Sequence, residues 1–156
     1  MNPEPMLVLL VEDNEDHAEL LKRTLREADH PIRIVHARDG EAALDYLGLS
    51  GAEAKFPGNP VPGLVLLDLR LPRIDGLDVL RRIKEVKRLR PVPVIILTTS
   101  SARADIARAY ASHANSYLAK PGSFDNFSRL MEAISRYWTV WNATPGASTP
   151  PPALPA

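Results

Sequence analysis

The sequence predicts an α/β fold in which a doubly wound, five-stranded parallel sheet carries helices on both faces. Short apolar runs alternate five times with stretches of helical periodicity, as expected when right-handed crossovers join parallel strands. The first, third and fourth runs are almost continuously apolar, which suits strands that are covered on both faces. A length of 156 residues, of which 45% are hydrophobic, is typical of one domain with one substantial core.

The predicted strands are runs rich in Val, Ile and Leu, and the predicted helices carry apolar residues at helical spacing. In chain order the strands cover residues 6–11, 32–37, 64–67, 94–97 and 116–119. Between them the helical stripes are Ala18, Leu21, Leu25 and Ala28, then Ala43, Leu44 and Leu47, then Val79, Leu80, Ile83 and Val86. A terminal amphipathic stripe consists of Phe124, Phe127, Leu130, Met131, Ile134, Tyr137, Trp138 and Trp141.

Two segments fall outside this alternation. Residues 48–63 contain four glycines and three prolines, which predicts a long surface loop before the third strand. Residues 143–156 are proline-rich and lack the apolar mass needed for packing. We therefore expect one domain over residues 1–142, followed by a disordered or extended tail.

Composition restricts the classes of partner and chemistry. The 19 basic and 19 acidic residues balance, so the overall charge favours neither nucleic acid nor a membrane surface as a partner. The basic segment 81–90 has an ordinary apolar inner face, so we interpret it as a solvated helix face. The absence of cysteine excludes disulfides and thiolate chemistry and fits a reducing compartment, so we expect a cytoplasmic location. The first apolar run is too short for a signal peptide or a membrane span.

Acidic residues follow two of the predicted strands directly. Glu12 and Asp13 follow the first strand, and Asp68 follows the third. Ligands of open parallel sheets bind at the carboxyl ends of the strands, so we expect these three carboxylates to meet. Like charges this close are unfavourable without a cation, and a hard divalent ion accepts carboxylate oxygens readily. The sequence therefore predicts a Mg²⁺ site at this edge.

Two further strands end in groups suited to phosphate chemistry. Thr98 and Thr99 follow the fourth strand with hydroxyl groups, and Lys120 follows the fifth with a positive charge that can pair with an aspartate or with phosphoryl oxygens. Each residue alone has an ordinary interpretation, as a helix cap, a β-branched strand residue or a loop lysine. Their conjunction at one edge favours a site. The four histidines, by contrast, show no metal-ligand spacing, and we expect them to be structural or exposed: His17, His30, His36 and His113.

Four segments carry a resemblance to a known family: VEDN (11–14), LLDLRLPRIDGLDVL (66–80), IILTTS (95–100) and YLAKP (117–121). Together they resemble the receiver domain of two-component response regulators, over about residues 6–140. The resemblance implies a flavodoxin-like sheet with strand order 2-1-3-4-5. It also implies that Asp68 accepts a phosphoryl group from a sensor histidine kinase.

The resemblance assigns roles to the other residues at this edge. It implies that Mg²⁺ is bound by the carboxylates of Asp13 and Asp68 and by the backbone carbonyl of Arg70, with Glu12 acting through water. Lys120 would contact the phosphoryl group, and the bond from Lys120 to Pro121 is expected to be cis, as in relatives.

A switch is implied as well. Thr98 resembles the hydroxyl residue that swings toward the phosphoryl oxygens, and Tyr117 resembles the aromatic residue that changes rotamer with it. Arg70 and Ser100 occupy positions that tune the lifetime of the phosphoryl group in this family.

A narrower resemblance concerns single-domain regulators that are paired with bacterial phytochrome histidine kinases. It is carried by the long loop before the third strand, by His113 and by the terminal segment RYWTVWNATP. His113 stands where most receivers have glycine, and Gly122 replaces the usual apolar residue. The resemblance implies a bacteriophytochrome as the partner kinase. The aromatic residues of the last helix favour an interface, and we expect a homodimer through the fourth helix, fifth strand and fifth helix.

Three functional hypotheses follow. The leading one is a stand-alone phosphoacceptor switch that catalyses its own aspartyl phosphorylation and slow dephosphorylation, without an output domain. A phosphatase or mutase with an aspartyl nucleophile usually has a second aspartate two residues later, where this sequence has Arg70. A third hypothesis is an adaptor that keeps the fold without the chemistry, against which the intact acidic, hydroxyl and lysine positions argue.

Overall fold

The computed structural model describes residues 4–27, 31–50 and 59–145 of the chain. They form a five-stranded parallel sheet with strand order β2-β1-β3-β4-β5, which confirms the predicted fold. The strands are β1 (Met6–Val11), β2 (Ile32–Ala37), β3 (Leu64–Leu67), β4 (Val94–Thr98) and β5 (Ser116–Ala119). Only β4 departs from the predicted bounds, because it extends by one residue to Thr98.

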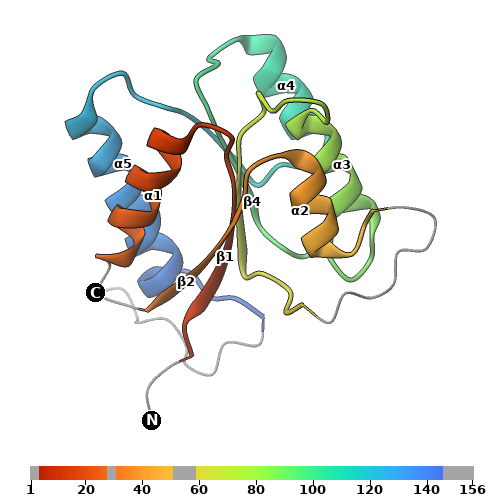
Figure 1. Ribbon diagram of the computed structural model, residues 1–156, viewed down its shortest axis with the longest axis horizontal. Helices are drawn as coiled ribbons and strands as arrows, with labels where there is room; N and C mark the ends of the chain where they lie inside the picture. Colours follow the sequence, from red (N-terminus) through yellow and green to blue (C-terminus); the bar gives the residue numbers. More distant parts are fainter. Residues whose placement is uncertain (1–3, 28–30, 51–58, 146–156) are drawn as a thin grey trace, which may run out of the picture.

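Helices cover both faces of the sheet (Figure 1). One face carries α1 (Glu15–Arg26) and α5 (Phe124–Arg136), and the other carries α2 (Gly40–Leu47), α3 (Gly76–Glu85) and α4 (Arg103–Ala111). Successive residues of a strand point to opposite faces, so β1 contributes Val8 and Leu10 to one apolar cluster and Leu9 and Val11 to the other. All four are at most 1% exposed, which shows that the sheet is the centre of both cores.

The helix termini follow local sequence signals. Asn14, Asp39 and Ser123 cap α1, α2 and α5, because each side-chain oxygen accepts a hydrogen bond from a backbone N–H in the first turn. Gly48 ends α2 with a φ of 74°, in the left-handed region that glycine adopts without a steric penalty. The predicted loop begins there, although its residues 51–58 lie outside the described residues.

The end of α5 differs from a regular helix. A π-helical segment, η1 (Tyr137–Trp141), continues from α5 and is closed by a hydrogen bond from the Asn142 N–H to the Tyr137 carbonyl at 2.7 Å. Trp138 packs against the core, whereas Tyr137 and Trp141 are exposed. Most of the proposed tail, residues 146–156, lies outside the described residues, as do Ala28 and His30.

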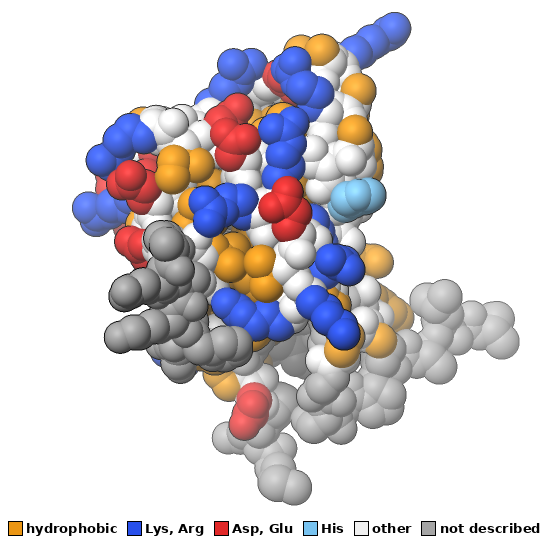
Figure 2. Space-filling view, turned by 90° about the vertical axis from the view of Figure 1, so that its right-hand side faces the viewer, with side chains coloured by type: hydrophobic (Ala, Val, Ile, Leu, Met, Phe, Trp, Pro, Cys, Tyr) orange, Lys and Arg blue, Asp and Glu red, His pale blue; other side chains and the backbone are white. Residues whose placement is uncertain are grey.

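One expectation is corrected and another is refined. No peptide bond in the described ranges is cis, so the Lys120–Pro121 bond is trans, consistent with the preference of X-Pro bonds for trans. The segment 81–90 is largely solvated, as expected, but only its first half is a helix face, because α3 ends at Glu85. Figure 2 shows basic side chains interspersed with acidic ones on this side of the molecule. Lys84 is the exception because it is buried, and its ammonium group donates to two backbone carbonyls and to the side chain of Asn115.

Another departure is conformational. His113 has a φ of 70°, in the left-handed region that side chains other than glycine seldom adopt. The receiver pattern has glycine at this position. His113 therefore adopts the left-handed backbone conformation without the conformational freedom of glycine. Among the described residues, no helix is both long and apolar enough to cross a membrane.

Candidate functional site

The carboxyl edge of the sheet brings together side chains from three separate strands. The backbone N–H groups of Glu12, Asp68 and Lys120 each continue the strand pairing by one hydrogen bond, to the carbonyls of Ala37 (3.1 Å), Val11 (3.0 Å) and Thr98 (2.7 Å). The residue after each strand is therefore held as firmly as the strand itself. Its side chain projects from the edge at a fixed place.

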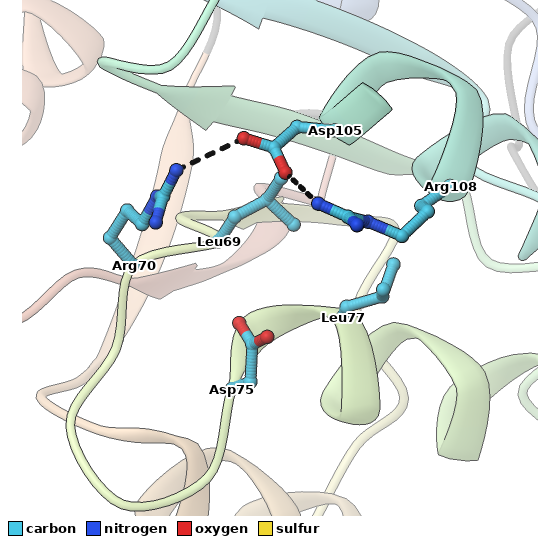
Figure 3. Close-up of a pocket in the computed structure, with 6 residues that line it drawn as sticks. All are labelled: Leu69, Arg70, Asp75, Leu77, Asp105 and Arg108. Atoms are coloured by element: carbon cyan, nitrogen blue, oxygen red, sulfur yellow. Dashed lines mark hydrogen bonds and ion pairs between the residues drawn. The ribbon is translucent and has the colours of Figure 1, made fainter. Parts of the chain in front are cut away.

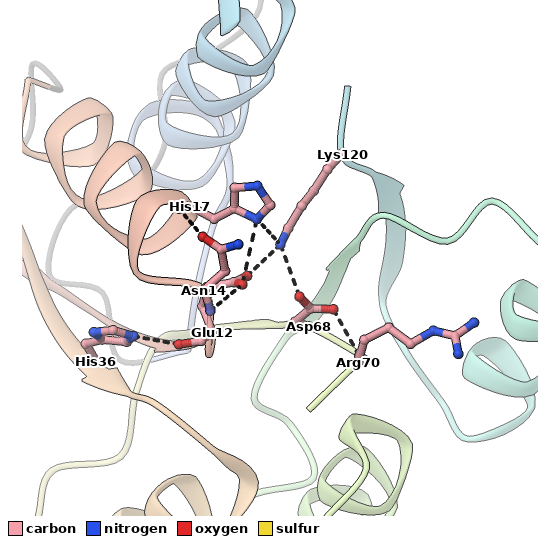
Figure 4. Close-up of polar contacts among 7 residues, drawn as sticks. All are labelled: Glu12, Asn14, His17, His36, Asp68, Arg70 and Lys120. Carbon is pink, nitrogen blue, oxygen red and sulfur yellow. Dashed lines mark hydrogen bonds and ion pairs between the residues drawn. The ribbon is translucent and has the colours of Figure 1, made fainter. Parts of the chain in front are cut away.

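Lys120 is the centre of the site (Figure 4). Its ammonium group donates hydrogen bonds to Glu12 Oε2 at 2.7 Å and to Asp68 Oδ2 at 3.1 Å, and it lies 3.0 Å from His17 Nδ1. The side chains of Lys120, Glu12 and Asp68 are only 3%, 2% and 7% exposed. Ion pairs this deeply buried interact strongly because water does not screen them.

The three predicted acidic residues do meet. Glu12, Asp13 and Asp68 each offer one oxygen within 4.8 Å of the others, and Asp13 is the exposed member of the group. Burial raises the pKa of Glu12 to about 7, because the desolvation penalty outweighs the opposing effect of Lys120. Three carboxyl groups lie close together here and only two of them, Glu12 and Asp68, contact an ammonium group, which leaves an excess of negative charge. Such an oxygen donor set fits a hard divalent cation such as Mg²⁺.

The backbone behind Asp68 also constrains the site. A Cβ atom on Gly76 would lie 2.1 Å from the Asp68 carbonyl oxygen, so only glycine lets α3 begin this close to the end of β3. His36 lies on the other side of the acidic group, where its Nε2 is 2.8 Å from the Glu12 carbonyl oxygen. These contacts fix the backbone that carries both carboxylates.

His17 belongs to the site, although the sequence interpretation treated it as an ordinary histidine. Its backbone N–H donates to the capping Asn14 side chain at 3.0 Å, and its ring stacks on Phe127 of α5 with centroids 6.1 Å apart. Burial, followed by the charge of Lys120, lowers the pKa of His17. Two signals could have identified it: it lies in the first turn after the acidic pair, and it shares a helix face with Leu21 four residues later.

The proposed switch residues lie beside this cluster. Thr98 is 0% exposed, and its hydroxyl group has no hydrogen-bond partner among the described residues. Tyr117 is half-buried, and its hydroxyl donates to the Ser100 carbonyl at 2.8 Å. Burial raises the pKa of Tyr117. The tyrosine thus holds the loop between β4 and α4, while the threonine hydroxyl is left without a partner.

Arg70 connects the site to α4. Its backbone N–H donates to Asp68 Oδ1 at 3.0 Å, but its guanidinium group turns away and pairs with Asp105 Oδ2 at 3.0 Å. Asp105 also accepts hydrogen bonds from Ser100 and from Arg108, and these bonds lower its pKa. Arg70, Asp105 and Arg108 line a small pocket of about 120 Å³, together with Leu69, Asp75 and Leu77. Figure 3 shows these six side chains. Sequence interpretation missed Asp105, for which the spacing of three residues to Arg108 on one helix was the available signal.

Comparison with known proteins agrees with this geometry. A family model described as the response regulator receiver domain matches residues 8–135. The probable methanogenesis regulatory protein FilR2 of Methanothrix harundinacea is 49% identical over 92% of this chain and 90% of its own length. The response regulator Rcp1 of Synechocystis is 34% identical over 94% of this chain and 97% of its own length.

Solved structures show the same similarity. The phosphorylated cyanobacterial phytochrome response regulator RcpA superposes with a TM-score of 0.84 and 32% identity, covering 92% of this chain and all (100%) of its own. The Mn²⁺-bound form of Rcp1 gives a TM-score of 0.81 at 34% identity, over 91% of this chain and 100% of its own. The matched residues, the strand order and the narrower likeness to RcpA all agree. The chain belongs to the response regulator receiver domain family and is a regulator of two-component phosphorelay signalling.

Proposed function

We propose that the protein accepts a phosphoryl group on Asp68 from a sensor histidine kinase, in a Mg²⁺-dependent reaction, and that phosphorylation changes its surface. The observation that carries the proposal is the position of Lys120, whose ammonium group lies 3.1 Å from Asp68 Oδ2 beside two further carboxylates. Phosphoryl transfer needs mainly positioning and positive charge, and this edge of the sheet offers both.

The acidic residues would hold the cation. Asp13 and Asp68 would bind Mg²⁺ through their carboxylates, Arg70 through its backbone carbonyl, and Glu12 through a water molecule. When bound, the cation would neutralise charge on the transferred group. The Mn²⁺-bound form of the relative Rcp1 supports a divalent ion at this kind of site.

Asp68 acts as the nucleophile in this proposal. One carboxylate oxygen attacks the phosphorus of a phosphohistidine on the kinase; an O–P bond forms as the P–N bond breaks, and the electron pair leaves with the imidazole. Asp68 thereby becomes an acyl phosphate, with Lys120 beside it to pair with a phosphoryl oxygen. Water later hydrolyses the acyl phosphate slowly, so the chain acts on its own side chain and not on a separate substrate.

The phosphorylated state would be read out through Thr98 and Tyr117. Within the part of the chain that the structure describes, the buried Thr98 hydroxyl has no hydrogen-bond partner, so a phosphoryl oxygen within reach would satisfy its donor. Movement of Thr98 would alter the loop that Tyr117 holds through the Ser100 carbonyl. Adding nearly two negative charges is a sufficient bias for such a two-state element.

We propose a bacteriophytochrome as the first candidate for the partner kinase, because RcpA, a phytochrome response regulator, matches the fold over most of this chain. FilR2, at higher identity, bears a name that concerns methanogenesis. A phosphotransfer assay should therefore include autophosphorylated kinases both with and without a light-sensing domain. Transfer within seconds to minutes to Asp68 from one kind, and not from the other, would identify the input.

A homodimer through α4, β5 and α5 is also part of the proposal. On this side, β5 is an edge strand, and Tyr110 of α4 and Phe124 of α5 are 50% and 62% exposed. Exposed aromatic residues beside an unpaired strand edge favour association. Sedimentation of wild type and of Tyr110→Ser/Phe124→Ser, each with and without phosphorylation, would test it. A monomer under all conditions would exclude the dimer.

The phosphoacceptor is tested by incubating the protein with Mg²⁺ and acetyl phosphate. We expect one hydroxylamine-labile phosphate per chain, located on Asp68 by mass spectrometry and absent from Asp68→Asn. Asp78→Asn is the matched control, because Asp78 is an exposed aspartate of α3 that pairs with Arg81. Repeated turnover of an added phosphomonoester would instead indicate a phosphatase. Uptake of no phosphate at all would favour the adaptor hypothesis.

A further inference from the structure

The ammonium group of Lys120 has three N–H donors and three neighbouring acceptors. Two of the acceptors are carboxylate oxygens, from Glu12 at 2.7 Å and Asp68 at 3.1 Å, and the third is His17 Nδ1 at 3.0 Å. An ammonium nitrogen has no lone pair, so it can only donate to the ring. Nδ1 of His17 must therefore be the unprotonated nitrogen, and the ring is the neutral Nε2–H tautomer in this arrangement.

The His17 ring is held from two other directions. Its main chain lies in the first turn of α1, where the N–H donates to Asn14 Oδ1, and its ring stacks on the buried Phe127 with an interplanar angle of 29°. The helix cap and the aromatic contact fix the position of the His17 ring. The ring can therefore fix the ammonium group of Lys120 that donates to it. Figure 4 shows the His17 ring on the side of Lys120 opposite Arg70.

Position matters here because the two carboxylates do not hold Lys120 equally. The contact with Glu12 is shorter than the contact with Asp68, and with these two acceptors alone the third N–H of the ammonium group would have no fixed direction. By accepting the third N–H, the neutral His17 ring fixes the rotation of the ammonium group, so that the other two N–H donors stay directed at Glu12 and Asp68. It does so without adding a fourth negative charge beside the place where a phosphoryl group arrives.

We propose that His17 is a positioning residue for phosphoryl transfer: its ring accepts a hydrogen bond from Lys120 and keeps the ammonium group in reach of Asp68. The inference rests on the proposed function for its kinetic consequence. The contact itself is independent of that function.

The kinetic experiment compares two substitutions of similar size. His17→Leu keeps an apolar side chain against Phe127 but removes the acceptor, whereas His17→Asn places an amide oxygen close to the position of Nδ1. With acetyl phosphate and saturating Mg²⁺, we expect His17→Leu to be phosphorylated roughly tenfold more slowly, as small misplacements of catalytic groups allow. His17→Asn should keep at least about half of the rate, and the Kd for Mg²⁺ should be unchanged in both variants.

A double-mutant cycle shows whether His17 acts through Lys120. Lys120→Met removes the donor, so adding His17→Leu to it should cause no further slowing. Equal slowing by His17→Leu in both backgrounds, or no slowing in the wild-type background, would overturn the inference. Urea unfolding of each variant establishes that the compared chains are folded.

A spectroscopic measurement tests the contact without phosphorylation. The ¹⁵N shifts of the His17 ring should show the Nε2–H tautomer in the wild type and a shift toward a mixture of tautomers in Lys120→Met. A substantial population of the Nδ1–H tautomer in the wild type would contradict the contact. If the wild type took up no phosphate, the proposed function would fail, and the ring shifts would still decide whether His17 accepts from Lys120.

Discussion

Two buried lysines lie at opposite edges of the same sheet, and they differ in the groups that accept their hydrogen bonds. Lys120 lies at the carboxyl edge, where Glu12 and Asp68 provide two carboxylates. Lys84, on α3, lies near the start of β4, where it donates to the carbonyls of Arg90 at 3.1 Å and Val92 at 2.8 Å. Its third acceptor is the side-chain oxygen of Asn115 at 3.0 Å.

The contrast shows that burial of a charged group does not by itself identify a functional site. The acceptors of Lys84 are neutral dipoles, two of them in the main chain, and they cannot take up a proton or a phosphoryl group at neutral pH. They join the end of α3 to the segments before β4 and β5. The acceptors of Lys120 can change their charge. A buried lysine surrounded by carboxylates has stronger functional implications than one surrounded by carbonyls.

The largest expected effect concerns the carboxyl edge. Lys120→Met should slow phosphorylation of Asp68 by acetyl phosphate about 10²-fold or more, because removal of one preorganised donor to developing charge costs that much in other sites. The initial rate of labelled-phosphate incorporation measures it. Lys84→Met is the comparison and should keep the wild-type rate within about twofold per folded molecule. Equal slowing in both would remove the distinction between the two lysines.

The second-largest expected effect is on the free energy of unfolding, to which Lys84 contributes at the end of the sheet where β4 begins. Lys84→Met leaves the carbonyls of Arg90 and Val92 and the amide of Asn115 without their donor, so we expect a loss of about 2–4 kcal/mol in the free energy of unfolding. Urea denaturation measures it. Lys87→Met, at an exposed position three residues later, should change stability by no more than about 0.5 kcal/mol. A loss equal to that of Lys87→Met would show that the carbonyl cage contributes little.

A smaller effect would sharpen the comparison within the carboxyl edge. Asp105 holds the loop before α4 through Ser100 and pairs with Arg70, whose backbone contacts Asp68. Asp105→Asn keeps the size of the side chain but removes its charge, which weakens the contacts with Arg70 and Ser100. The backbone amides of residues 100–105 should therefore exchange with deuterium roughly three- to tenfold faster. Asp125→Asn, at an exposed position in the first turn of α5, should leave that exchange unchanged. Unaltered exchange in Asp105→Asn would mean that other contacts hold the loop.

These two edges also show what the sequence could predict. The strand runs and the residues that directly follow them depend on topology alone, so the meeting of Glu12, Asp13 and Asp68 could be predicted before the structure was known. Lys84 could not be placed by charge, because it lies in a basic segment whose other members are largely solvated. Its spacing of four residues from Leu80 did put it on the buried face. That signal was outweighed by the general cost of burying an ammonium group.

Contacts made by long or rotatable side chains were harder to predict. His17 and Asp105 reach the site only because α1 and α4 have a particular rotation about their axes, which short apolar stripes define poorly. The Arg82 and Arg88 side chains illustrate the same difficulty, since their guanidinium groups donate to carbonyls near the end of α2, far away in sequence. Periodicity predicts which face of a helix is inward. It does not predict which acceptor a flexible cation will find.

The smallest expected effect is the pH dependence of stability that Lys84 causes. Burial lowers the pKa of Lys84 from its ordinary value of 10.5. Between the lowered folded pKa and 10.5, the unfolded chain binds more protons at this position than the folded chain does. Stability contributed by Lys84 therefore rises with pH across that window, and it is lowest below the folded pKa, where the buried amine carries its charge.

The measurement is the difference in unfolding free energy between wild type and Lys84→Met, taken from urea denaturation at several pH values up to about 10.5. The difference should move in favour of the wild type as pH rises. Burial raises the pKa values of Tyr46 and Tyr117, so their contribution to the free energy of unfolding falls in the same alkaline range. Both proteins contain these tyrosines, so this contribution cancels in the difference. A difference that stays constant, or that moves against the wild type, would mean that the acceptors of Lys84 stabilise the charged amine at least as well as water does. Burial of the Lys84 ammonium group would then carry no net electrostatic cost.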